Sequence, residues 1–134
     1  MELNMRLEEY GKVIIDDANM LLREDSSLSE RQRKSVSKIP MYAEKLIFLY
    51  KNCLSDLAVE TDKHLRIRIA SGMFHDARAM LAGILTQYQI IENYLSTPQW
   101  TEKDSELFLH IHKYNCLIIA EVEESNRDLL NLTK

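Results

Sequence analysis

The sequence predicts an all-α protein, an antiparallel bundle of two helical hairpins with four helices in the chain. Only 3 glycines and 2 prolines occur in 134 residues, whereas a β-rich fold needs many more turn residues. Apolar residues recur at spacings of three and four along most of the chain, which is typical of amphipathic helices. The length favours one compact domain, built from a hairpin over residues 1–60 and a second over residues 61–134.

The first helix is expected over residues 2–23. Its apolar stripe consists of Leu3, Leu7, Tyr10, Ile14, Ala18 and Leu21. Gly11 weakens helix formation by about 1 kcal/mol relative to alanine. Residues 25–27 are Asp-Ser-Ser, which are turn formers and should end the helix.

Ser29 is the expected N-cap of the second helix, and Gln32 stands where a capping box needs its partner. The apolar stripe is Val36, Ile39, Tyr42, Leu46, Leu49, Cys53 and Leu57. Pro40 predicts a kink near residues 38–40, unless the helix begins at Pro40 itself. No glycine or proline marks a stop over residues 56–62, so a turn and a continuous rod both fit. We favour the turn because most helices are far shorter than such a rod.

The third helix, over residues 62–95, has the most regular seam. Its apolar positions are Ile67, Ala70, Phe74, Ala77, Leu81, Ile84, Tyr88, Ile91 and Leu95. Residues 96–98 should end it, and Thr101 is the expected N-cap of the fourth helix, with Asp104 placed to favour the helix dipole. The fourth stripe is Leu107, Ile111, Tyr114, Ile118, Val122, Ser125, Leu129 and Leu132. The short connection requires these two helices to be antiparallel neighbours.

Composition excludes several classes of protein. The net charge is −4 and the basic residues are scattered apart from residues 31–34, which argues against a nucleic-acid surface. No window approaches ~20 consecutive apolar residues, so no membrane span is expected. The acidic N-terminal segment is unlike a signal peptide, and the protein is therefore expected to be cytoplasmic.

The cysteines, tyrosines and remaining histidines are interpreted mainly as structural residues. Cys53 and Cys116 fall at apolar helical spacing and are predicted to be buried, reduced thiols. Tyr88, Tyr94 and Tyr114, with Met73 and Met80, are predicted to pack in or beside the core. His110 and His112 do not share a helix face and His64 has no partner at ligand spacing, so no metal or cofactor is expected.

His75 is the residue that could carry chemistry. With Ile67 at heptad position a, His75 falls at b, which faces solvent, and Arg78 lies on the same face one turn later. An exposed neutral imidazole is a good nucleophile. Asp76 could hold its tautomer or take a proton, and Arg78 could neutralise phosphoryl oxygens. These three residues suit a phosphoryl acceptor, and the alternative is a surface histidine without a role.

The stretch MFHDARAMLAGILTQYQII resembles the H-box of the dimerisation and histidine phosphotransfer domain of bacterial sensor histidine kinases. The matching residues are His75, Asp76, Ala77, Arg78, Leu81 and Ile84. The similarity continues through the hairpin to the ending DLLNLTK and covers about residues 63–134. It implies a phosphotransfer protein of two-component signalling whose partner is a response-regulator receiver domain or a histidine kinase. It also implies a possible homodimer, since the family's hairpins pair into four-helix dimers.

The sequence departs from the family's pattern at two positions. Ala79 stands where the family has a Thr or Asn that supports dephosphorylation of the partner, and Met80 replaces a proline. No nucleotide-binding motif is present, so self-phosphorylation is not expected of this chain. What remains resembles a stand-alone histidine phosphotransferase. The second hypothesis is a non-catalytic adaptor that binds a histidine kinase or a response regulator and alters its output.

Overall fold

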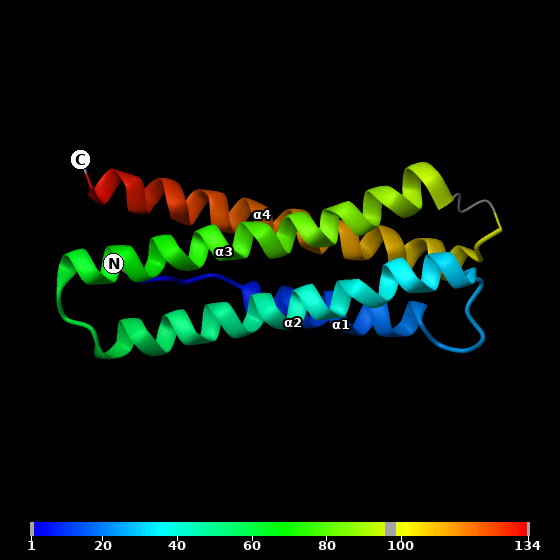
Figure 1. Ribbon diagram of the computed structural model, residues 1–134, viewed down its shortest axis with the longest axis horizontal. Coiled ribbons are helices and arrows are strands. Elements are labelled where there is room, and N and C mark those ends of the chain that lie inside the picture. The colour runs from blue at the N-terminus through cyan, green and yellow to red at the C-terminus, as the bar shows by residue number, and fades with distance from the viewer. Residues whose placement is uncertain (1, 96–98, 134) are drawn as a thin grey trace.

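The computed structural model describes residues 2–95 and 99–133. Within these ranges the elements are α1 (Leu7–Leu21), α2 (Glu30–Val59), α3 (Lys63–Ile90), the π-helical turn η1 (Ile91–Leu95) and α4 (Glu102–Leu132). The four α-helices run side by side along the length of the molecule, and the described ranges contain no strand (Figure 1). The predicted all-α bundle is confirmed.

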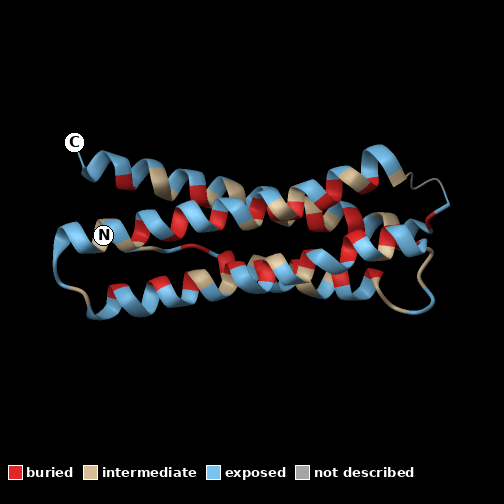
Figure 2. Cartoon of the chain, in the orientation of Figure 1, coloured by how far each residue is buried: buried red, intermediate tan, exposed pale blue. Residues whose placement is uncertain are grey.

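The helices pack as an up-and-down bundle in which each helix is antiparallel to the next (Figure 1). Backbone contacts join α1 to α2, α2 to α3, α3 to α4, and α4 back to α1. The four helices therefore enclose one core, and buried residues line their inner faces (Figure 2). The largest fully buried side chains include Leu7, Ile14, Leu21, Ile39, Leu46, Phe74, Ile84, Ile111 and Ile118. This shared core places the first hairpin directly against the hairpin that carries His75.

α1 is only half as long as its neighbours, with 15 residues against 30 in α2 and 31 in α4. The expected helical start at residue 2 is wrong, because side chains of other helices bind the preceding backbone. Tyr50 Oη accepts the Met5 N–H and donates to the Met5 carbonyl, both at 3.2 Å. Glu121 accepts the Arg6 N–H at 2.7 Å. Residues 2–6 are therefore not helical, and they run toward the end of the bundle where α2 meets α3 (Figure 1).

The predicted start of α2 is confirmed by a complete capping box. Ser29 Oγ accepts the Gln32 N–H at 3.2 Å, and Gln32 Oε1 accepts the Ser29 N–H at 2.8 Å. Pro40 lies inside α2, so the alternative that this helix begins at Pro40 is wrong. The favoured turn between α2 and α3 is confirmed at residues 60–62.

Polar side chains close both junctions that flank α3. At its start, Asp62 caps the helix by accepting the Leu65 N–H at 3.0 Å, and Arg66 donates to the Leu57 carbonyl at the end of α2. At its other end, the expected stop at residues 96–98 lies outside the described residues. The predicted cap Thr101 is confirmed, because its hydroxyl accepts the Asp104 N–H at 3.2 Å.

Three predicted core positions are wrong, and one of them is Leu132 in the last turn of α4, which is 45% exposed. Tyr94 is 81% exposed, because it lies in η1, where the wider π-helical turn changes the face that each side chain takes. Cys116 is exposed because the core position next to it is taken by a polar residue, Asn115, which is 1% exposed. The apolar pattern passed over Asn115, although the predicted stripe residues Ile111, Ile118, Val122 and Leu129 are buried as expected.

Candidate functional site

His75 lies near the middle of α3 and points to solvent, as its heptad position predicts. Its side chain is 88% exposed, whereas Phe74 and Ala77 on the opposite face are buried in the core. Three of the neighbours of His75 on its own face are small, namely Ser71 and Gly72 one turn before it and Ala79 one turn after, and the fourth is Arg78. An added Cβ at Gly72 would meet nothing within 4 Å. The imidazole is therefore open to a large partner.

Asp76 contacts the ring of His75 directly, although consecutive residues of an α-helix point about 100° apart. The distance from His75 Nδ1 to Asp76 Oδ1 is 3.2 Å. An ionised carboxylate only accepts hydrogen bonds, so Nδ1 carries the proton in the neutral ring and Nε2 carries the lone pair. The pair therefore leaves Nε2 as a nucleophile facing solvent.

Arg78 shares the face of His75 but its guanidinium is bound to α4. Its Nε donates to Glu123 Oε1 at 2.8 Å and its Nη2 donates to Glu123 Oε2 at 2.9 Å. This pairing raises the pKa of Arg78 and lowers the pKa of Glu123. The sequence pattern did not identify Glu123 as the partner of Arg78. No local signal could have found it, because the contact depends on how α3 and α4 align.

The remaining histidines lie in separate places. His64 is exposed in the first turn of α3. His110 Nδ1 contacts Asp17 Oδ2 across α1 and α4, while the ring of His112 stacks on Tyr88 with centroids 4.1 Å apart. Within the described ranges, no group of three or more His, Cys, Asp or Glu residues could hold a metal ion.

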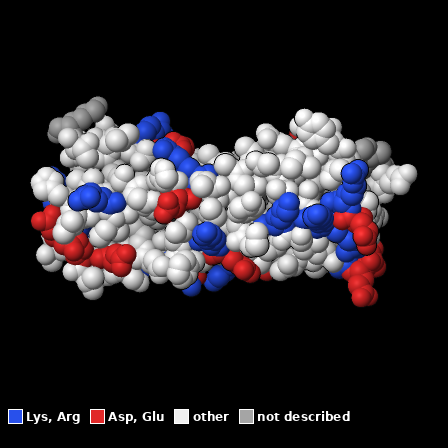
Figure 3. Space-filling view, viewed as in Figure 1, with Lys and Arg blue, Asp and Glu red and all other residues white. Residues whose placement is uncertain are grey.

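Charged side chains of both signs are mixed on the face that Figure 3 draws. On the face drawn in Figure 3, Lys and Arg are interspersed with Asp and Glu instead of forming one basic area. This face therefore lacks the electrostatic footprint of a nucleic-acid-binding surface. In addition, none of the helices in the described ranges combines the length and the hydrophobicity needed to span a bilayer.

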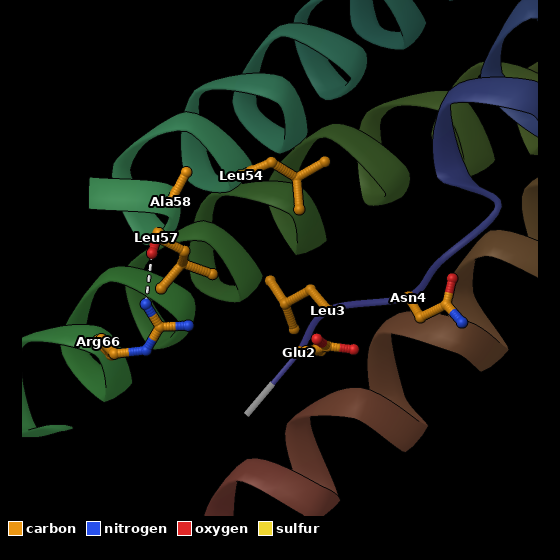
Figure 4. Close-up of a pocket in the computed structure, with 7 residues that line it drawn as sticks. All are labelled: Glu2, Leu3, Asn4, Leu54, Leu57, Ala58 and Arg66. Carbon is orange, nitrogen blue, oxygen red and sulfur yellow. Dashed lines mark hydrogen bonds between the residues drawn. The ribbon is translucent and has the colours of Figure 1, made fainter. Parts of the chain in front are cut away.

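A hollow of about 410 Å³ lies at the end of the bundle that α1 does not reach. Leu3, Leu54 and Leu57 contribute apolar walls, and Arg66 lines one side with its guanidinium on the Leu57 carbonyl (Figure 4). His75 does not line this hollow. The candidate site is therefore an exposed helix face rather than a cleft.

No family model, curated protein or solved structure matches this chain. The resemblance of residues 63–134 to histidine phosphotransfer hairpins thus rests on the sequence pattern.

Proposed function

We propose that this protein is a phosphotransfer protein of two-component signalling, with His75 as the residue that accepts a phosphoryl group and passes it on. The observation that carries the proposal is the exposed imidazole whose Nδ1 lies 3.2 Å from a carboxylate oxygen, within a stretch that resembles an H-box. The partner would be the receiver domain of a response regulator, and it would supply the Mg²⁺, since the described residues offer no cluster of ligands for a metal ion.

The proposed step is an in-line transfer between two side chains. Nε2 of His75 attacks the phosphorus of an aspartyl phosphate on the partner, the P–O bond to that aspartate breaks, and its carboxylate leaves. The new N–P bond leaves positive charge on the imidazole ring. Asp76 stabilises this charge through Nδ1–H, and the reverse reaction returns the phosphoryl group to another receiver domain.

The position of the first hairpin fits a chain that acts alone. Where family hairpins pair with a second chain to complete four helices, α1 and α2 pack on α4 and α3 of the same chain. The proposal therefore does not require the homodimer that the resemblance implies. A partner would instead approach the outer face of α3, where Ser71, Gly72 and Ala79 leave room around His75.

A non-catalytic adaptor is the second candidate, and the Arg78–Glu123 pair favours it. A guanidinium bound through two hydrogen bonds to Glu123 does not meet a phosphoryl group on His75 unless that pair opens. In this alternative, the exposed face of α3 binds a histidine kinase or receiver domain without accepting its phosphoryl group.

Transfer of radiolabelled phosphate from phosphorylated receiver domains of the same genome tests the proposal. The wild type and His64→Gln, a matched change of an exposed histidine in the same helix, should become labelled, while His75→Gln should not. Label on His75→Gln equal to that on the wild type, or no label on any variant, contradicts the proposal. Binding of the receiver domain without any transfer of label would support the adaptor.

A further inference from the structure

Helix α1 begins in a different way from the other α-helices of the bundle. A side chain caps the first turn of α2, α3 and α4, whereas within the described part of the chain Arg6 makes no such cap for α1. The backbone of Arg6 is already close to helical, with φ −87° and ψ 24°. Residues 2–6, the N-terminal segment, contain neither glycine nor proline. The local sequence therefore does not stop α1 at Leu7.

Contacts from two other helices keep the N-terminal segment out of a helix. The hydroxyl of Tyr50 in α2 bonds both the N–H and the carbonyl of Met5, and Glu121 in α4 accepts the Arg6 N–H. The side chain of Met5 is 8% exposed and belongs to the core. A helix over this segment would give up these contacts of Met5, whose carbonyl would accept the N–H four residues later instead.

A helical form of this segment would bury a different side chain. Leu3, Leu7, Tyr10 and Ile14 follow one another at spacings of four, three and four, so in a continuous helix Leu3 would join the inner stripe of α1. Met5, two residues from both Leu3 and Leu7, would then lie on the opposite face. The non-helical form buries Met5 and leaves Leu3 only partly buried. The two forms thus exchange Leu3 for Met5 in the core.

Space on both sides of the segment leaves room for this exchange. Leu3 lines the hollow of about 410 Å³ together with Leu54 and Leu57 (Figure 4). It also lines a second hollow, of about 60 Å³, together with Leu129 of α4. A single strand of chain is thinner than a helix with its side chains, which is about 10–12 Å across. Residues 2–4 therefore do not fill the place that α1 takes in the rest of the bundle.

We propose that residues 2–6 are a conformational switch, which exchanges between this non-helical form and an N-terminal extension of α1. Each residue advances the chain by about 3.3 Å when extended but by about 1.5 Å in a helix, so the change would draw Leu3 roughly 7 Å toward Leu7. Leu57 and Leu129, which share the two hollows with Leu3, would become more exposed. The switch thus covers and uncovers apolar side chains at this end of the bundle, independently of the proposed phosphotransfer.

The ¹³Cα chemical shifts of residues 3–5, measured by NMR, report which form is present. Tyr50→Phe removes both hydrogen bonds to Met5 and should raise the ratio of helical to non-helical form by about 5- to 30-fold. Met5→Ala and Leu3→Ala are a matched pair, because methionine and leucine have nearly equal helix propensities. Combined with Tyr50→Phe, Met5→Ala should move the Asn4 shift further toward helical values, since only the non-helical form buries Met5. Leu3→Ala should move it back, since the helical form buries Leu3 more fully.

Shifts of residues 3–5 that stay non-helical in the double variant Tyr50→Phe/Met5→Ala would overturn the proposal, as would equal effects of the two alanine substitutions. If Tyr50→Phe does not fold, Met5→Ala alone supplies the deciding measurement. In that variant the Asn4 shift should lie closer to helical values than in the wild type. An Asn4 shift that is unchanged, or that moves away from helical values, rejects the switch.

Discussion

Arg78 of α3 binds Glu123 of α4 through two parallel hydrogen bonds of 2.8 and 2.9 Å, one helical turn from His75. Both side chains are about half exposed, at 47% and 48%. Exposed ion pairs typically contribute at most about 1 kcal/mol to stability. Arg78 can therefore leave the Glu123 carboxylate and bind another oxyanion at a small cost in free energy. A phosphoryl group on His75 would present such an oxyanion on the same face of α3.

Glu123→Gln should therefore increase phosphoryl transfer to His75. The neutral amide binds the guanidinium more weakly, which leaves Arg78 free to meet the phosphoryl oxygens. We expect the initial rate of labelling to rise by about two- to tenfold, corresponding to roughly 0.4–1.4 kcal/mol of stabilisation in the transition state. Arg78→Ala should lower the rate. Glu124→Gln is the matched control, and equal rates in the two glutamine variants would show that the pair does not restrain Arg78.

The contrast between His75 and Arg78 shows what the sequence could predict. The seam over residues 67–95 placed His75 on the outer face, and the short signals at Ser29 and Thr101 located two helix starts, because these features depend on neighbours along the chain. The partner of Arg78 depends on the alignment of two helices, with Glu123 lying 45 residues away. The same applies to Tyr50, which binds the Met5 backbone from another helix and so removes the first turns expected of α1.

Asp104 is another residue whose contacts its position in the sequence did not reveal. It was expected to favour the helix dipole, but it is fully buried and accepts hydrogen bonds from Arg23 at 2.7 Å and from the N–H and hydroxyl of Ser27 at 2.8 and 2.6 Å. Burial alone would raise its pKa, but the bonds from Ser27 and Arg23 outweigh burial and lower the pKa to about 2. The ionised carboxylate thus joins the loop after α1 to the first turn of α4.

The stability contributed by Asp104 should be lost in acid. Because its pKa is lowered in the folded state, this contribution is complete above the ordinary pKa of 3.8 and disappears as the pH falls toward about 2. The shift corresponds to about 2 kcal/mol. Urea unfolding at pH 7, 4, 3 and 2, followed by fluorescence of Trp100, the one tryptophan of the chain, measures this loss.

Asp104→Asn isolates the contribution of this carboxylate. The variant should be less stable than the wild type at pH 7 by about 2 kcal/mol or more, since Arg23 and Ser27 lose an ionised acceptor. The difference in unfolding free energy between the wild type and Asp104→Asn should narrow between pH 4 and pH 2. A difference that stays constant over this range would show that another group titrates. Asp128→Asn, which changes an exposed carboxylate of α4, should leave stability almost unchanged.

Tyr50→Phe should release the segment before α1. The phenol makes both hydrogen bonds to the Met5 backbone, and these bonds are buried. We expect a loss of about 1–2 kcal/mol in the free energy of unfolding. The Met5 amide should also exchange with solvent faster than in wild type. Unchanged exchange at Met5 would mean that packing of residues 2–6, rather than Tyr50, holds this segment in place.

Gly72 and Gly83 offer a matched pair of alanine substitutions within α3. Alanine stabilises an exposed helix position by about 0.5–1 kcal/mol relative to glycine. Gly72→Ala should realise this gain, because its added Cβ meets nothing within 4 Å. At Gly83 the added Cβ would come within 2.7 Å of ring carbons of Tyr42, which packs against the core.

Gly83→Ala should therefore reduce stability by about 1–3 kcal/mol, since the ring must shift and its packing against the core is disturbed. Urea unfolding of both variants measures the opposite signs directly. The double variant with Tyr42→Ala removes the obstructing ring, so Gly83→Ala should no longer be destabilising in that background. If Gly83→Ala remains equally destabilising there, close packing of α3 against Tyr42 is not the cause, and the contact does not fix the spacing between α2 and α3.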